Sequence, residues 1–374
     1  MKDLPLDKND VYYDLALSQV DGIGAKSLKK LVAHFGSSRE VFRRDLAELV
    51  STPGMNISRA EAIVSFSGFD RVDREMRFAE ENGIELVSFL DARYPNRLKH
   101  CEDGPVVLFV KGGAKLAAGR MLSIVGTRRV TGYGKSMARK IVETVAPHGV
   151  TVVSGLAYGV DIEAHRACVE LGVPTIAVLG HGLHEVYPVS HTRYALDIVE
   201  HGGALVSEFV AGTRPDRENF PQRNRIVAGM SDATVVVESG KSGGSMITAS
   251  LASEYNRDVF AVPGRIDDPL SEGCNHLIAT KKAKLLTSPA QLLSEMGWLP
   301  SASATKKHIQ KKIFVDLSPE DEKILGLLRE KTRLQIDDLG LEMKMPTSRL
   351  LVLLLNLELN GLVRSLPGKV YETC

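Results

Sequence analysis

Short apolar runs alternate with amphipathic stretches through the middle of the chain, and this alternation constrains the fold more than any other feature. The runs of strand length are residues 108–111, 122–126, 151–155, 175–180, 204–209, 233–239 and 258–264. The helix-length stretches between them include residues 135–146, 162–171 and 247–255. Continuous apolar strands that alternate with helices are typical of a mostly parallel sheet covered on both faces. We therefore expect a Rossmann-like doubly wound α/β domain over residues 87–299, with ligands at the carboxyl ends of its strands.

The first 86 residues are predicted to form a helical domain of the helix-hairpin-helix or SAM-like type. Residues 20–24 read Val-Asp-Gly-Ile-Gly and precede an amphipathic helix predicted over 25–35, which is the pattern of such a hairpin. The hairpin can offer backbone N–H groups to a phosphate without sequence choice. A second hairpin is expected near residues 52–57, where the second glycine is absent. A bundle used only for packing or protein contact is an equal alternative.

The end of the chain has the pattern of a winged helix over residues 316–374, after a lysine-rich stretch at 300–315 that we predict to be a flexible basic linker. Ser318 before Pro319 and two acids predicts the start of a helix. Two more helices are expected near 336–341 and 347–360, followed by a two-stranded wing. Because Arg349 is the only basic residue of the leucine-rich segment 347–360, we expect it to contact protein rather than read DNA.

Composition narrows the classes of function. The 47 basic and 46 acidic side chains almost cancel, so a nucleic-acid site has to be a local patch. The four cysteines are scattered without metal-ligand spacing, so we expect a reducing cytoplasm, no metal and no cofactor. We also expect no signal segment, and the most apolar run, 350–359, is too short to cross a bilayer. These features predict a cytoplasmic protein without a membrane partner.

Residues 220–225 read Phe-Pro-Gln-Arg-Asn-Arg, and Arg217 precedes them. A guanidinium group can donate two hydrogen bonds to one phosphate, and the face of a phenyl ring can stack on an unpaired base. This combination suits a flexible polyanion that carries flat bases. The alternative is a surface loop with solvated arginines, in which Phe220 anchors the loop to the core.

Two other loops have the composition of anion-binding sites. Residues 126–128 read Gly-Thr-Arg at the end of a predicted strand, where the backbone can approach a phosphate and Arg128 can hold it. Gly243, Gly244 and Ser245 lie just before a predicted helix and form a potential nest of backbone donors. The dinucleotide pattern GxGxxG and the full Walker A pattern are both absent from the sequence, so neither NAD nor a nucleoside triphosphate is expected.

Acidic and histidine side chains near these loops offer few catalytic groups. Asp161 and His165 are four residues apart on a predicted helix and form a potential metal or acid–base pair. With no third ligand in register, we favour a structural role, in which Asp161 caps the helix or fixes a neighbouring guanidinium. His181 and His184 are interpreted as loop anchors.

The motifs occur in one order and resemble a known family as a set. They are Asp-Ala-Arg-Tyr-Pro-Asn-Arg-Leu at 91–98, Gly-Thr-Arg at 126–128, Ser-Gly-Leu-Ala-Tyr-Gly-Val-Asp at 154–161, Phe-Pro-Gln-Arg-Asn-Arg at 220–225, Ser-Gly-Gly-Ser-Met-Ile-Thr-Ala at 242–249, Ala-Val-Pro-Gly at 261–264 and Gly-Cys-Asn-His-Leu-Ile at 273–278. Together they resemble the DNA-processing protein A (DprA, also called Smf) family over roughly residues 90–290. The two flanking regions resemble the accessory domains of that family.

The resemblance implies a non-catalytic protein that binds single-stranded DNA, protects incoming DNA and loads the RecA recombinase in natural transformation. Arg128 would hold a phosphate, Phe220 would stack on a base, and Arg223 with Asn224 would complete the rim. The full set of DNA contacts that it implies is Gly126, Thr127, Arg128, Arg217, Phe220, Arg223, Asn224, Gly243, Gly244 and Ser245.

A homodimer is also implied, and we assign Leu277 and Ile278 to its interface. Lys281-Lys282-Ala283 departs here from the Gly-Ala pair of the family. Two other functions stay open. The first is a Rossmann enzyme that cleaves nucleoside monophosphates, with Glu238 and Arg128 as its catalytic candidates. The second is a scaffold that binds only protein.

Overall fold

The computed structural model describes residues 8–299 and 317–373. These residues form two compact units, one that ends at Leu286 and one that begins at Thr287. The predicted linker at 300–315 lies outside the described residues. The boundaries drawn from the sequence at 86/87, 299/300 and 315/316 stay predictions.

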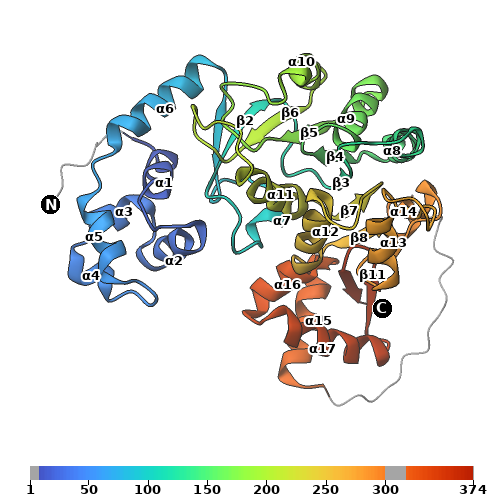
Figure 1. Cartoon of the computed structure of the whole chain (residues 1–374). Coiled ribbons are helices and arrows are strands. Elements are labelled where there is room, and N and C mark those ends of the chain that lie inside the picture. The colour runs from blue at the N-terminus through green and yellow to red at the C-terminus, as the bar shows by residue number, and fades with distance from the viewer. Residues whose placement is uncertain (1–7, 300–316, 374) are drawn as a thin grey trace. The chain divides into compact units, whose positions relative to one another are not determined.

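The first unit is built on a nine-stranded sheet, with the strand order β1-β2-β6-β5-β4-β3-β7-β8-β9 (Figure 1). The strands are β1 (Glu85–Ser88), β2 (Val107–Gly112), β3 (Met121–Val125), β4 (Thr151–Ser154), β5 (Thr175–Val178), β6 (Ala204–Ser207), β7 (Ala233–Val236), β8 (Asp258–Ala261) and β9 (Lys284–Leu285). Pairing is antiparallel from β1 to β2 and from β2 to β6, and parallel elsewhere. The predicted α/β fold with a mostly parallel sheet is therefore confirmed.

Helices cover both faces of this sheet, and the alternation of side chains along each strand explains why. Ile176 and Val178 of β5 belong to the main core cluster, whereas Ala177 between them belongs to a second cluster. Figure 1 shows α8, α9 and α10 together on one side and α11 with α12 on the other. The helices of this region are α7 (Asn96–Lys99), α8 (Gly132–Val145), α9 (Val160–Leu171), α10 (Thr192–Glu200), α11 (Asn219–Met230), α12 (Gly244–Glu254) and α13 (Glu272–Ala279), with 3₁₀ turns at Ala146–His148 and Val189–His191.

Six N-terminal helices pack on one edge of the sheet. They are α1 (Asp10–Ser18), α2 (Ala25–Phe35), α3 (Ser38–Arg43), α4 (Leu46–Val50), α5 (Ile57–Ser65) and α6 (Phe69–Glu81). Val107 and Phe109 of β2 join the core of these helices, so the helical region takes the place of a covering helix there. The buried carboxylate of Asp14 in α1 accepts hydrogen bonds from Ser38 and from Ser88 of β1. The predicted hairpin helix over residues 25–35 is confirmed as α2.

The second unit contains the winged helix. Its elements are α14 (Pro289–Glu295), α15 (Pro319–Lys331), β10 (Leu334–Gln335), α16 (Ile336–Met343), α17 (Thr347–Leu359), β11 (Val363–Leu366) and β12 (Val370–Thr373). The predicted cap is present, because the Ser318 hydroxyl accepts a hydrogen bond from the Asp321 backbone N–H at 3.1 Å. Helices α15, α16 and α17 and a three-stranded sheet of order β10-β12-β11 confirm the winged-helix prediction.

Candidate functional site

A cavity of about 320 Å³ opens at the carboxyl ends of β3, β4 and β7. The strand order reverses between β3 and β7, and this switch point is where doubly wound sheets bind ligands. The strands end earlier than predicted, so that residues expected in the sheet, such as Gly126 and Ser239, instead form the loops around the cavity. The lining residues are Val125, Gly126, Thr127, Arg128, Gly155, Ala157, Asp161, Phe220, Arg223, Asn224, Val227, Ser239, Gly240, Ser242, Gly243, Gly244, Ser245 and Thr248.

The segment 220–225 is helical, which corrects its interpretation as a loop. It forms the first turns of α11, with Glu218 as the N-cap residue. Pro221 fits there because the first turn of a helix has no intrahelical use for the missing N–H. Helical spacing then separates the side chains. Phe220 and Asn224 are half-buried, whereas Arg223 is buried.

The Arg223 side chain forms the floor of the cavity, so the prediction that it lies at the rim is wrong. It is 4% exposed, and its guanidinium donates to the carbonyl oxygens of Gly155 and Val178. Burial lowers the pKa of Arg223 to about 10, and the nearby carboxylate of Asp161 opposes this shift. A side chain at Gly155 would collide with this guanidinium, which explains the glycine there.

Arg225 is also engaged inside the protein. Its guanidinium pairs with Glu208 and donates to the carbonyl oxygen of Asp103. Arg217 is exposed but does not line the cavity. Of the arginines singled out from the sequence, Arg128 is the exposed one that lines the cavity.

The rim combines this cation with an aromatic ring. The guanidinium carbon of Arg128 lies 5.4 Å from the ring centroid of Phe220, within the range of a cation–π contact. Phe220 itself is half-buried and also contacts the ring of Tyr187 at 6.0 Å between centroids. The loop that carries Arg128 is tied to the end of β7, because the Thr127 N–H donates to the carbonyl of Glu238 at 2.7 Å.

The glycine-rich loop before α12 places the N-terminus of that helix at the same cavity. Helix α12 begins at Gly244, and its N-cap residue Gly243 provides no side-chain cap. The first N–H groups of a helix carry a partial positive charge and attract anions. Asn224 donates to the Gly244 carbonyl at 3.2 Å, and the hydroxyls of Ser245 and Ser239 share a hydrogen bond of 2.8 Å. The loop therefore gathers polar donors around the mouth of the cavity.

Asp161 and His165 have structural contacts. The Asp161 carboxylate accepts from the N–H groups of Gly155 and Ala157 at 3.1 and 3.4 Å, and burial raises its pKa. The Nδ1 of His165 donates to the Thr175 hydroxyl at 2.8 Å, because that hydroxyl itself donates to the Val152 carbonyl. Burial lowers the pKa of His165 to about 3, so the imidazole is neutral. Asp161 therefore holds the loop after β4, and His165 fixes helix α9 to the start of β5.

His181 and His184 anchor loops, as interpreted from the sequence. His181 accepts a hydrogen bond from the Tyr187 N–H, and His184 accepts one from the Gly212 N–H at 3.1 Å. Throughout residues 8–299 and 317–373, no group of three or more His, Cys, Asp and Glu side chains has the arrangement of a metal site. Tyr187, beside Phe220, was missed in the sequence because no spacing rule links a residue of the loop after β5 to one of helix α11.

Leu277 lies in the core of its own chain, which contradicts its assignment to a dimer interface. It is 2% exposed and belongs to the main core cluster, and Ile278 is half-buried against the same cluster. Glu238, the candidate catalytic acid, is 2% exposed, and its carboxylate accepts hydrogen bonds from the backbone N–H and the hydroxyl of Thr131. Leu277 and Glu238 are therefore both buried, and neither side chain is available at the surface.

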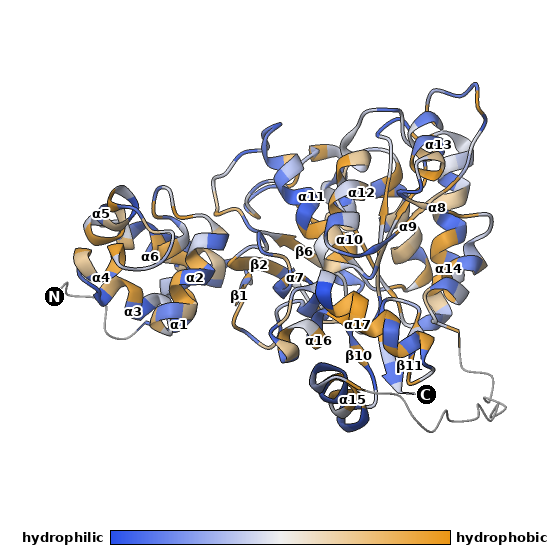
Figure 2. Cartoon of the chain, turned by 90° about the horizontal axis from the view of Figure 1, so that it is seen from below, coloured by the Kyte–Doolittle hydropathy of each residue, from blue (hydrophilic) through white to orange (hydrophobic). Residues whose placement is uncertain are grey.

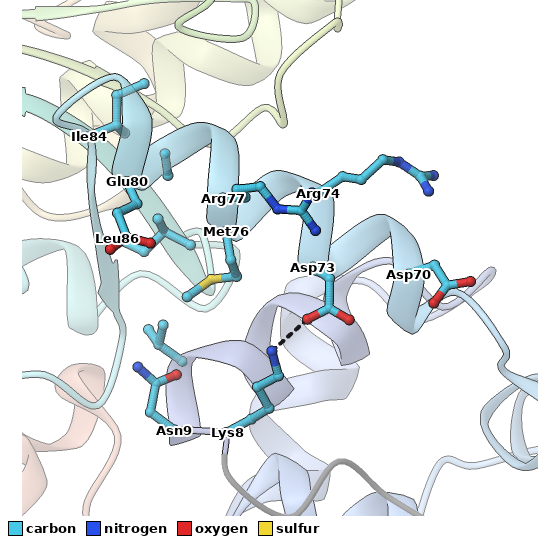
Figure 3. Close-up of a pocket in the computed structure, with 12 residues that line it drawn as sticks. Lys8, Asn9, Asp70, Asp73, Arg74, Met76, Arg77, Glu80, Ile84 and Leu86 are labelled. Carbon is cyan, nitrogen blue, oxygen red and sulfur yellow. Dashed lines mark hydrogen bonds and ion pairs between the residues drawn. The ribbon is translucent and has the colours of Figure 1, made fainter.

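A second cavity, of about 980 Å³, lies between the start of the described chain, α6 and β1 (Figure 3). Its walls carry both signs of charge, and Lys8 is paired with Asp73 across it at 2.6 Å. None of the residues predicted from the sequence to bind DNA lines this cavity. The cavity at the carboxyl ends of the strands is therefore the candidate site.

Comparison with known proteins identifies the family. The family model described as DNA recombination-mediator protein A matches residues 85–297, which is more than half of the chain. The chain belongs to the DprA/Smf family. A DprA winged-helix model matches residues 315–369, and a SAM-like tandem helix-hairpin-helix model matches residues 14–66. The tandem helix-hairpin-helix match agrees with the second hairpin expected near residues 52–57, between α4 and α5, although this hairpin lacks the second glycine.

Individual DprA and Smf proteins are similar over most of the chain. Protein Smf of Escherichia coli is 35% identical over 86% of this chain and 86% of its own length. The X-ray structure of DprA from Streptococcus pneumoniae superposes with a TM-score of 0.67 at 32% identity, covering 77% of this chain and 98% of that one. DNA processing protein A from Helicobacter pylori, solved for its unique single-stranded DNA binding mode, gives a TM-score of 0.51 at 27% identity over 57% and 95% of the chains. Within the described ranges, no helix is both long and apolar enough to span a membrane.

Proposed function

We propose that this protein binds single-stranded DNA at the cavity formed by the ends of β3, β4 and β7, and that it loads RecA onto that DNA in natural transformation. Membership of the DprA family supports the proposal. The single-stranded DNA binding of the Helicobacter pylori relative supports it as well. No catalytic step is part of the proposal.

The observation that carries the proposal is the position of Arg128 over Phe220 at the mouth of a cavity that also receives the N-terminus of α12. Arg128 and the first N–H groups of α12 are suited to phosphate oxygens. The ring of Phe220 is suited to the face of a base in an unpaired strand. Because neither contact reads a base edge, binding should not depend on sequence.

Fluorescence anisotropy with labelled oligothymidine and with a duplex of equal length tests the DNA part. The single strand should bind more tightly, and its affinity should fall steeply with salt, since each cation–phosphate contact releases counterions. Arg139→Ala is a matched control, because Arg139 is an exposed arginine outside the cavity that pairs with Glu143 and Glu170. Equal affinity for duplex and single strand would contradict the proposal.

The RecA part needs a separate measurement. RecA-dependent ATP hydrolysis on single-stranded DNA should start sooner when this protein is present, and Arg128→Ala should remove the acceleration. An acceleration that survives loss of DNA binding would show that RecA is contacted without loading.

We also propose that the protein works as a homodimer, with Ile278 near the interface. Ile278 is half-buried, whereas Leu277 is ruled out by its position in the core. Light scattering of the wild type and of Ile278→Arg tests this. Circular dichroism of the same samples separates a folded monomer from an unfolded chain.

The enzyme alternative is less well supported. Its candidate acid, Glu238, is buried and bonded to Thr131, so the carboxylate is occupied in holding the loop that precedes α8. Release of base from nucleoside monophosphates, followed by chromatography, would revive this alternative if the release were lost in Glu238→Gln.

A further inference from the structure

Tyr187 is an exposed aromatic residue that no motif singled out. Its side chain is 44% exposed, and its ring lies 6.0 Å from that of Phe220 with a tilt of 36° between the ring planes. This separation is within the contact range of aromatic pairs, so the two rings form one continuous apolar surface. Phe220 lines the cavity, and Tyr187 extends this surface beyond it.

We infer that Tyr187 is a second base-stacking residue, and that the DNA strand leaves the cavity across the loop after β5. The inference rests on the proposed function. Single-strand binding proteins place successive bases on neighbouring aromatic rings, and each ring accepts any base. Phe220 at the cavity and Tyr187 beside it supply two such neighbouring rings.

The loop that carries Tyr187 is held in place from inside the protein. The Tyr187 N–H donates to Nε2 of His181 at 3.2 Å, and Nδ1 of His181 donates to the Gly182 carbonyl at 2.9 Å. His181 is 1% exposed, and burial lowers its pKa, which keeps the imidazole neutral and Nε2 able to accept. The Ser207 hydroxyl also donates to the His181 carbonyl at 2.6 Å. A ring on a preorganised loop loses little freedom when a base stacks on it.

A second exposed tyrosine, Tyr158, contacts the loop that carries Tyr187. Tyr158 follows β4, is 48% exposed, and its hydroxyl bonds that of Ser190 at 3.1 Å. On the side of β8, the comparable ring is Tyr133, which is 49% exposed and has its hydroxyl bonded to the Pro263 carbonyl at 3.1 Å. Among the described residues, the ring in contact with Phe220 is that of Tyr187, and Tyr133 makes no ring contact with Phe220. The aromatic surface therefore continues from Phe220 toward β5 and not toward β8.

The experiment measures affinity for oligothymidines of increasing length by fluorescence anisotropy, using the full chain. Tyr187→Ala should weaken binding of the longer oligomers by about 5- to 100-fold, the range expected for one lost base stack. The loss should shrink for the shortest oligomer that binds, which fills only the cavity. Tyr187→Phe should stay within about twofold of the wild type, because stacking uses the ring and not the hydroxyl. Tyr133→Ala is the matched control on the β8 side and should also stay within about twofold.

A fluorescence measurement keeps the inference testable if Tyr187→Ala fails to fold. Tyr187→Trp should bind at least as tightly as the wild type, and its added tryptophan emission should be quenched when the oligomer binds. The inference is overturned if Tyr187→Ala binds as tightly as Tyr133→Ala, or if Tyr133→Ala shows the larger loss. These outcomes differ from failure of the proposed function, in which the wild type itself does not prefer single strands and Arg128→Ala changes nothing.

Discussion

Two surfaces of the protein differ in chemistry, although both belong to folds that occur in nucleic-acid-binding proteins. One is the cavity at the ends of β3 and β7, which is polar and cationic, and the other is the outer face of α17, which is apolar. The cavity offers a guanidinium, an aromatic ring and the backbone donors of a helix N-terminus. Helix α17, largely coloured hydrophobic in Figure 2, exposes Val352 (59%), Leu355 (55%) and Leu359 (77%). Its basic residue, Arg349, is paired with Glu320 at 2.7 Å.

The residues at a surface, and not the fold that carries them, decide what the surface binds. A recognition helix that reads DNA needs polar and basic side chains toward the groove. An exposed stripe of large apolar side chains instead marks a surface for protein contact. The exposure of these side chains on α17 is consistent with the sequence-based prediction that segment 347–360 contacts protein.

The largest expected effect is on stability, at the floor of the cavity. Arg223→Met should lower the free energy of unfolding by about 3–5 kcal/mol, because it leaves the buried Asp161 carboxylate without its nearby cation. Urea denaturation measures this change. The exposed Arg139→Met is the control and should change the value by about 0.5 kcal/mol or less. A similar small loss for Arg223→Met would show that the cavity tolerates an unpaired Asp161.

The next effect compares one arginine from each region. Arg128→Ala should weaken single-strand binding by about 2 kcal/mol, the scale of a charge-assisted contact. Arg349→Ala in α17 removes the same charge and should leave the affinity unchanged. Anisotropy at fixed salt gives both values. If the two variants lose affinity equally, the winged helix takes part in DNA binding and the contrast between the regions fails.

Phe220→Ala should weaken single-strand binding by about 1–3 kcal/mol without unfolding the protein, and Phe220→Trp should retain it. The contact between Arg128 and Phe220 sharpens the test, because the ring can act on a base or by orienting the guanidinium. A double-mutant cycle with Arg128→Ala separates these roles. If the double variant binds no worse than Arg128→Ala alone, Phe220 acts through Arg128 and does not stack on a base.

Acid should destabilise the first unit through His165. Its folded pKa of about 3 lies below the ordinary 6.5, so the unfolded state binds more protons as the pH falls between these values. The free energy of unfolding should then fall by up to about 1.4 kcal/mol per pH unit below pH 6.5. His165→Asn should remove this slope in a series of denaturation curves. Residues 317–373 contain no histidine, so unfolding of the winged helix should lack the same slope.

The smallest expected effect comes from the apolar face of α17. Leu355→Ser and Leu359→Ser should change DNA affinity and stability little, by about 0.5 kcal/mol or less, since both side chains are mostly exposed. Self-association measured by light scattering should decrease in the same variants if the face contacts a second copy. A large loss of DNA affinity in these variants would show that the apolar face of α17 takes part in DNA binding.

Local patterns predicted much of the architecture. The apolar runs located β2 to β8, and Ser318 with Pro319 located the start of α15. They succeeded because strand period, helix caps and glycine turns depend on neighbours in the sequence. The same reasoning missed helix α11 around residues 220–225, because a proline beside an arginine-rich run resembles a turn unless its position within a helix is known.

The sequence alone determined the α/β alternation, the flanking helical and winged regions, and the set of loops that meet at one edge of the sheet. Only the tertiary structure decided which side chains in those loops face outward. Arg223 bonds the carbonyls of Gly155 and Val178, which are 68 and 45 residues away. Leu277 likewise meets a core built from distant strands. Such burial depends on how far-separated elements pack, and that information is not contained in any local pattern of residues.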